Sequence, residues 1–163
     1  MVLPTGGGST GAIEKALHFL QTMSESNADW KNPTIFLTPY EHHSNILPWV
    51  EFYEKNEVLA HNKIGTLDME RIIKQLSECS SNHIIVTVSA ASNVTSKLTH
   101  LKELNDVISK FQSYLEYVRQ TTNKSIVFCV DCAAFCCHHD LNLSIYDQID
   151  FAFLSPHKNL GGA

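Results

Sequence analysis

The chain has 163 residues, which is enough for one domain with a hydrophobic core of its own. Hydrophobic residues make up 44%, charged residues make up 18%, and the formal net charge is −5, as in a globular protein that stays in solution. Arg71 and Arg119 are the only arginines and no basic patch is present, so nucleic acid is not expected as a partner. No apolar run approaches the roughly 20 residues that cross a bilayer, so no membrane contact is expected either.

The chain opens on a glycine-rich turn directly in front of an amphipathic segment. Gly6, Gly8 and Gly11 satisfy G-x-G-x-x-G, and Ser9 and Thr10 stand where a helix would be N-capped. Free backbone N–H groups and the positive end of the helix dipole converge at such a turn. The turn therefore predicts a phosphate site.

Predicted helices then alternate with short apolar strands along the chain. Helices are predicted over roughly 11–25, 44–55, 67–76 and 98–122, and strands over 33–38, 57–61, 84–89, 125–130 and 151–154. Short, continuous apolar strands separated by helices favour a mostly parallel sheet covered on both faces, a three-layer α/β/α fold. Ligands of such folds collect at the C-terminal ends of the strands.

Polar residues follow four of these predicted strands. In chain order they are residues 41–45 (EHHSN), residues 92–95 (SNVT), Asp131 and residues 155–158 (SPHK). Each of them alone has an ordinary explanation as a loop, capping or surface residue. Because the C-terminal ends of parallel strands share one edge of a sheet, the sequence predicts that they meet beside the glycine turn.

A lysine, a carboxylate, a histidine and an amide around a phosphate site fit pyridoxal 5′-phosphate (PLP). A lysine amine can form a Schiff base with an aldehyde cofactor. A carboxylate against a pyridine nitrogen keeps that nitrogen protonated, and the ring then draws electrons from the substrate. A histidine can stack on the ring, an asparagine amide can bond its phenolic oxygen, and the helix N-terminus can hold its phosphate.

With these motifs in this order, the chain resembles the class V aminotransferases of PLP fold type I, especially their cysteine desulfurase and selenocysteine lyase branch. The resemblance runs from about Gly6 to Gly162. It implies that Lys158 holds the cofactor as a Schiff base, that Asp131 pairs with the pyridine nitrogen and that His42 stacks on the ring. It also implies that Asn93 contacts the phenolic oxygen. The phosphate would be held by Ser9, Thr10, Ser155 and His157.

The resemblance also predicts what surrounds this site. Residues 1–163 would form a single, incomplete PLP-binding large domain, without the family's N-terminal segment and C-terminal small domain. The expected partners are an amino-acid substrate, cysteine or a related β-substituted compound, a second copy of the full-length protein in a homodimer, and a sulfur acceptor protein. The family commonly has glutamine where this chain has Ala134, so one bond to the phenolic oxygen would be lost or replaced.

Three alternatives follow from the same residues. Cysteines crowd residues 129–137 next to His138 and His139, which suggests zinc, but the pair at 129 and 132 straddles a strand end and faces opposite sides. No metal is therefore expected. An NAD(P)-binding Rossmann domain needs a strand before the glycines and leaves Asp131 unexplained. A PLP-binding remnant without catalysis is the third. Reduced thiols and the lack of a signal peptide predict a cytoplasmic location.

Overall fold

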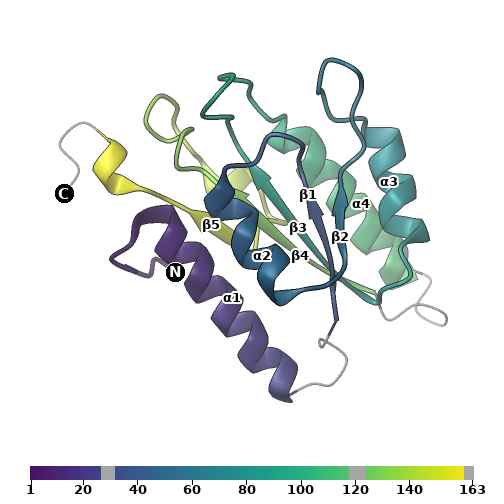
Figure 1. The fold of residues 1–163 in the computed structure, drawn as a ribbon. Helices are drawn as coiled ribbons and strands as arrows, with labels where there is room; N and C mark the ends of the chain where they lie inside the picture. The colour runs from purple at the N-terminus through teal and green to yellow at the C-terminus, as the bar shows by residue number, and fades with distance from the viewer. Residues whose placement is uncertain (27–31, 118–123, 160–163) are drawn as a thin grey trace.

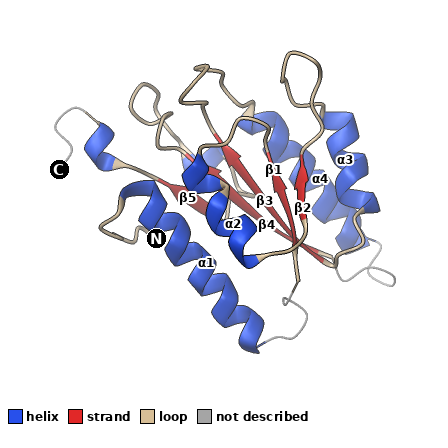
Figure 2. Cartoon of the chain, viewed as in Figure 1, coloured by secondary structure: helices blue, strands red, loops and turns tan. Residues whose placement is uncertain are grey.

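The computed structural model describes residues 1–26, 32–117 and 124–159. A five-stranded sheet forms its centre, with the strand order β2-β1-β3-β4-β5 (Figures 1 and 2). Every strand pair is parallel, which confirms the predicted sheet. The strands are β1 (Thr34–Leu37), β2 (Asn56–Val58), β3 (His83–Ser89), β4 (Ser125–Asp131) and β5 (Phe151–Phe153).

Helices cover both faces of this sheet, as Figure 1 shows. The α-helices are α1 (Gly8–Ser26), α2 (Leu47–Phe52), α3 (Met69–Glu78) and α4 (Leu101–Tyr117). Among the described residues, the loops contain the short 3₁₀ helices η2 (His43–Asn45), η3 (Leu143–Ile145) and η4 (Pro156–Lys158). Helices α1 and α2 pack on one face and α3 and α4 on the other, so the predicted three-layer α/β/α class is confirmed.

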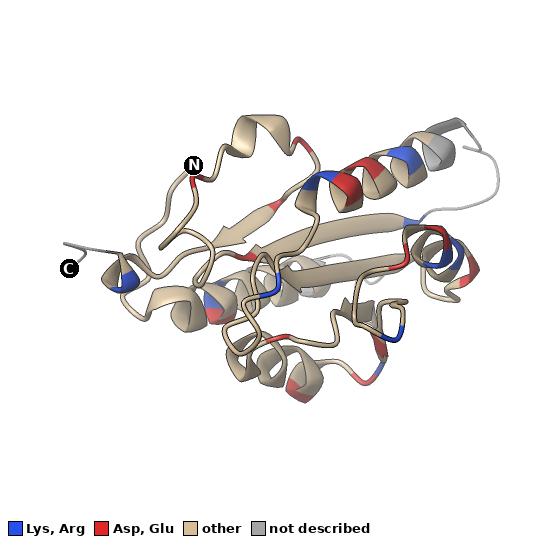
Figure 3. Cartoon of the chain, turned by 90° about the horizontal axis from the view of Figure 1, so that it is seen from above, with Lys and Arg blue, Asp and Glu red and all other residues tan. Residues whose placement is uncertain are grey.

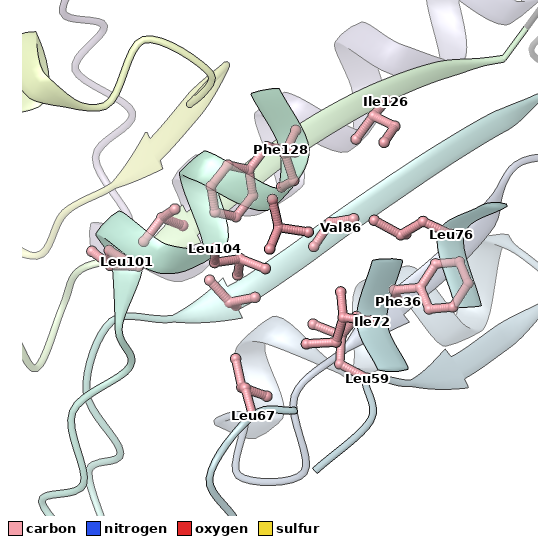
Figure 4. Packing of buried hydrophobic residues seen from close by; sticks show 14 of the residues in the cluster. Phe36, Leu59, Leu67, Ile72, Leu76, Val86, Leu101, Leu104, Ile126 and Phe128 are labelled. Carbon is pink, nitrogen blue, oxygen red and sulfur yellow. The ribbon is translucent and has the colours of Figure 1, made fainter. Parts of the chain in front are cut away.

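Alternate residues of β3 supply the two halves of the core. Val86 packs in the cluster under α3 and α4, whereas Ile85 packs in the cluster under α1 and α2. Leu104 of α4 and Leu76 of α3 belong to the first cluster, and Figure 4 shows both beside the strands. All seven residues of β3 are buried, because a central strand of a parallel sheet is covered on both faces.

Shortening one of these core side chains should destabilise the whole chain. Leu104 is fully buried, so Leu104→Ala is expected to lower the free energy of unfolding by about 2–5 kcal/mol through lost burial and a residual cavity. Urea unfolding followed by circular dichroism measures the change. Lys110→Ala on the exposed side of α4 is the control and should change stability by less than about 0.5 kcal/mol. Equal stability of the two variants would contradict this packing.

Several predicted element boundaries are wrong. Helix α1 begins at Gly8, three residues earlier than predicted, so Ser9 and Thr10 lie in its first turn and not at its cap. The helix predicted over 44–55 is divided into η2 and the short α2, which has a proline in its first turn. Residues 98–100 are not helical, because Leu98 forms an antiparallel bridge with Ala91 and the Thr99 N–H donates to the carbonyl of Ala90 (2.9 Å). The predicted end of that helix, at 122, lies outside the described residues.

Charged side chains of both signs are interspersed on the surface. Figure 3 shows acidic and basic residues following one another along α4, where Lys102 and Asp106 approach to 3.4 Å. Such exposed pairs contribute little stability, typically about 0.3–0.5 kcal/mol on a helix. Within the described ranges, no helix is long and apolar enough to cross a membrane.

Candidate active site

A cavity of about 290 Å³ lies at the C-terminal edge of the sheet, between the start of α1 and the loops that follow the strands. Each residue that the sequence nominated for the site lines it. They are Ser9 and Thr10 from α1, His42 from the loop after β1, Asn93 from the loop after β3, Asp131 at the end of β4, and Ser155, His157 and Lys158 after β5. The structure thus brings the nominated residues together, while their individual roles remain predictions.

Asp131 is the buried charge of this cavity. It ends β4 with only 5% of its surface exposed, and its Oδ1 accepts the N–H of Ala133 at 3.0 Å. Burial raises the pKa of the carboxyl, although the Ala133 N–H and the charges of Lys158 and His42 partly oppose this. A buried carboxylate at the wall of a cavity is well suited to a ligand that carries a positive charge or an N–H donor.

The start of α1 is fastened to the segment that carries Lys158. The Ser9 N–H donates to Ser155 Oγ at 2.9 Å, across 146 residues of sequence. Gly8 has φ +59°, and a Cβ there would lie 2.9 Å from His157 Cε1. Only glycine therefore allows this close approach. A surface suited to an anion such as phosphate is formed by the N-terminal end of α1, the hydroxyls of Ser9, Thr10 and Ser155, and the His157 imidazole.

Adding a methyl group at Gly8 should disturb this contact. Gly8→Ala is expected to lower the free energy of unfolding by about 1–3 kcal/mol, because alanine is strained at positive φ and its Cβ would clash with His157. Thermal unfolding measures the effect. The matched control is Gly11→Ala in the same helix, where a Cβ meets Thr5 only at ordinary contact distance, so stability should stay equal or rise. The opposite order of the two variants would refute the close approach.

His42 stands at the opening of the cavity as the N-cap of η2. Its Nδ1 accepts the N–H of Ser44 at 3.1 Å and lies 2.7 Å from the Ser44 hydroxyl. A backbone N–H requires an unprotonated acceptor, so the neutral ring carries its proton on Nε2. Lys158, on η4, is exposed, as a lysine that must react with a ligand would be.

Two further cavities frame this site. One of about 370 Å³ adjoins it and shares Ala91, Asn93, Ala134 and Lys158 with it. The larger one, of about 460 Å³, lies between α1 and α2 and is mostly apolar, and Thr10 alone of the nominated residues reaches it. The cavity of about 290 Å³ is the best candidate for the active site, because polar and titratable groups converge there.

The cysteines of residues 129–137 do not assemble a metal site. Cys129 packs in the cluster under α1 and α2, whereas Cys132 packs in the cluster on the opposite face. Burial raises the pKa of the Cys129 thiol well above its ordinary value, which disfavours the thiolate that binds metals. In the part of the chain that the structure describes, no three His, Cys, Asp or Glu side chains group as metal ligands would.

The family model named aminotransferase class-V matches residues 5–163. The chain belongs to the class V aminotransferase family. This is a family of PLP-dependent enzymes, and the match does not favour the NAD(P)-binding alternative.

Relatives of this class V aminotransferase chain include cysteine desulfurases. A probable cysteine desulfurase of Pyrococcus abyssi is 26% identical over 132 residues, which are 78% of this chain and 28% of that protein. The solved apo structure of cysteine desulfurase from Thermococcus onnurineus NA1 matches 92% of this chain and 33% of its own, with a TM-score of 0.70 and 22% identity. The Escherichia coli cysteine desulfurase CsdA gives a TM-score of 0.63 and 23% identity, over 93% of this chain and 34% of its own.

These likenesses confirm the predicted PLP fold type I architecture for this class V aminotransferase chain. The chain spans about a third or less of the length of these relatives. At 22% and 23% identity, the likeness to the solved structures supports the fold only.

Two residues of this class V aminotransferase chain that support the site, Glu41 and Ser89, were not predicted from the sequence. Glu41 and Ser89 hydrogen-bond to each other at the ends of β1 and β3, and Ser89 also lines the cavity. Burial raises the pKa of Glu41, while bonds from Ser89, Thr38 and Asn45 oppose this. The available signal was the position of Glu41 beside His42, since a carboxylate at a strand end seldom lies there without donors.

Proposed function

We propose that this chain binds PLP in the cavity at the C-terminal edge of the sheet and forms the cofactor-binding part of a cysteine desulfurase-like enzyme. Such an enzyme would remove sulfur from L-cysteine or carry out another reaction of the class V aminotransferases. One observation carries the proposal: the buried Asp131, the lysine of η4 and the start of α1 line the same cavity. Family membership supports it independently.

The residues present suit PLP at both of its ends. Ser9, Thr10, Ser155 and His157 surround the α1 N-terminus, where the phosphate would lie. Asp131, across the cavity, would accept a hydrogen bond from the protonated pyridine nitrogen, with a charge that its burial makes more effective. When bound, PLP supplies an electron-withdrawing ring that stabilises negative charge on the substrate's carbon.

The chain's own side chains would perform the remaining tasks. Lys158 Nζ would attach the cofactor covalently and, once substrate has displaced it, would take and return protons at the substrate's carbon. His42 would cover one side of the ring and limit access of water, and Asn93 would donate to the phenolic oxygen. Ala134 also lines the cavity, and its methyl group offers no hydrogen bond to that oxygen.

The proposed substrate comes from the relatives' names, and the proposed partners come from the family resemblance. The matched curated relatives are cysteine desulfurases or probable cysteine desulfurases by name, so we infer an amino-acid substrate, with L-cysteine first among the candidates. A homodimer of the full-length protein, a sulfur acceptor protein and a cytoplasmic location belong to the same proposal. Activity is proposed for the whole protein that contains this chain.

Covalent trapping tests the proposal. Purified protein mixed with PLP should develop a near-visible absorbance band, and borohydride reduction should fix the cofactor on Lys158, where peptide mass mapping would find it. Trapping on another lysine, or none, would overturn the site. In the full-length protein, formation of alanine from L-cysteine tests the reaction, with the sulfur measured as sulfide after an added thiol reductant has reduced it. PLP bound on Lys158 without any turnover would identify the non-catalytic alternative.

A further inference from the structure

We propose that Glu41 is a positioning residue, which holds His42 at the cavity through a polar network between the ends of β1 and β3. For its effect on PLP, this inference rests on the proposed function. For its effect on the His42 ring, it rests on the structure alone. Glu41 does not line the cavity, so any influence on a ligand would pass through its neighbours.

The Glu41 carboxylate is surrounded by donors. Oε1 accepts the Ser89 N–H at 2.8 Å and the hydroxyl of Thr38. Oε2 accepts the Ser89 hydroxyl at 2.6 Å and the Asn45 side-chain amide at 2.7 Å. Four donors use both oxygens fully, and bonds to a charged acceptor are the strong ones.

These donors connect three separate parts of the fold. Thr38 follows β1, Ser89 ends β3 and Asn45 belongs to η2. Asn45 is itself fixed, because its Oδ1 accepts from Trp49 Nε1 at 3.1 Å and from Thr87 Oγ1 at 2.7 Å. The loop that follows β1 is therefore pinned to β3 and to α2 at once.

His42 lies inside this pinned loop, directly after Glu41. Its backbone is extended, with φ −72° and ψ 148°, and its Nδ1 is capped by the Ser44 N–H. Ser44 in turn directly precedes Asn45. Since both neighbours of the His42–Ser44 pair are held by the network, the network fixes the direction of the imidazole and keeps its proton on Nε2.

The donor pattern makes glutamine an informative replacement for Glu41. Its amide has nearly the same shape but places two N–H donors where one carboxylate oxygen accepted. One orientation turns the amide NH₂ toward the Ser89 N–H, and the other turns it toward the Asn45 amide, whose own oxygen is already used. In either orientation, an N–H of the new amide faces another N–H donor, so the loop after β1 must shift.

Two readouts test the inference, and the first needs no cofactor. In the ligand-free protein, ¹⁵N chemical shifts of the His42 ring, assigned with His42→Gln, should show the Nε2–H form. Glu41→Gln should move them toward a mixture of tautomers, while the exposed control Glu54→Gln should not. An unchanged His42 ring in Glu41→Gln would overturn the inference, whether or not PLP binds.

The second readout is a double-mutant cycle on PLP affinity. Glu41→Gln should weaken binding about tenfold in the wild-type background and have almost no further effect in His42→Ala, because the effect passes through that ring. Equal losses in both backgrounds would show a merely structural role and refute positioning. If Glu41→Gln does not fold, Thr38→Val removes one donor to Oε1 and should give the same pattern more weakly. Failure of the wild type to bind PLP would refute the proposed function but leave the ring measurement decisive.

Discussion

Lys158→Ala is expected to abolish borohydride-stable incorporation of PLP, reducing the labelled fraction to the level of untreated protein. The reason is chemical, because alanine offers no amine to the aldehyde. Non-covalent binding should persist at lower affinity, since the phosphate would still meet the start of α1 and the hydroxyl of Ser155. Mass spectrometry of the reduced protein measures the covalent part, and fluorescence titration measures the non-covalent part.

The control for this variant is an exposed lysine far from the cavity. Lys63→Ala removes the same amine from the loop after β2, so it should label as completely as the wild type. Labelling of Lys158→Ala at wild-type level would mean that another lysine reacts, and the site assignment would be wrong. Adding a small primary amine to Lys158→Ala should restore part of any turnover that the full-length protein shows.

Asp131→Asn should weaken PLP binding by roughly ten- to one-hundredfold, because it removes the charge that would face the pyridine nitrogen. The same variant should be more stable than the wild type without PLP at pH 7. Burial raises the pKa of Asp131 above its ordinary 3.8, so ionising it costs the folded protein free energy. The protonated Asp131 carboxyl favours the folded state below the ordinary pKa, and this stabilisation is lost as the pH rises through the raised pKa of the folded protein.

Melting temperatures with and without PLP, measured from pH 4 to pH 7, check both parts. Without PLP, the advantage of Asp131→Asn over the wild type should be largest at pH 7 and shrink toward pH 4. With PLP, the order should reverse, because the cofactor stabilises the form that it binds more tightly. Asp140→Asn, on the exposed loop beyond β4, should follow the wild type throughout. A pH-independent difference would contradict a buried, ionising Asp131.

Most of the fold and the cavity residues were predictable because both depend on local pattern. The β-branched run at 84–89 could only be a buried strand, and in a parallel sheet each strand brings its following residue to one edge. The sequence alone therefore predicts that Asn93, Asp131 and Lys158 lie together. The structure bears out their meeting, while their roles await the experiments above.

What escaped prediction depends on contacts between distant parts of the chain. Helix α1 begins at Gly8, earlier than predicted, because its first turn docks against the segment after β5. No pattern within residues 6–11 reveals that partner. The Glu41 network likewise unites two strand ends and η2. Ile73 is 38% exposed although it follows the fully buried Ile72, since α3 buries a narrow stripe through Ile72 and Leu76. Periodicity gives a face but not its width.

The bond between Ser9 and Ser155 also bears on how the protein is made. The phosphate-site residues at the start of α1 and after β5 come together only when these two segments pack against each other. The bond between them closes a loop of 146 residues. Contacts so distant in sequence form late and slowly in folding, because the loop-closure entropy must be overcome first. During synthesis, the helix that begins at Gly8 leaves the ribosome long before its counterpart exists. We therefore expect PLP binding to require both segments, and a nascent chain stalled before Ser155 should be unable to retain PLP.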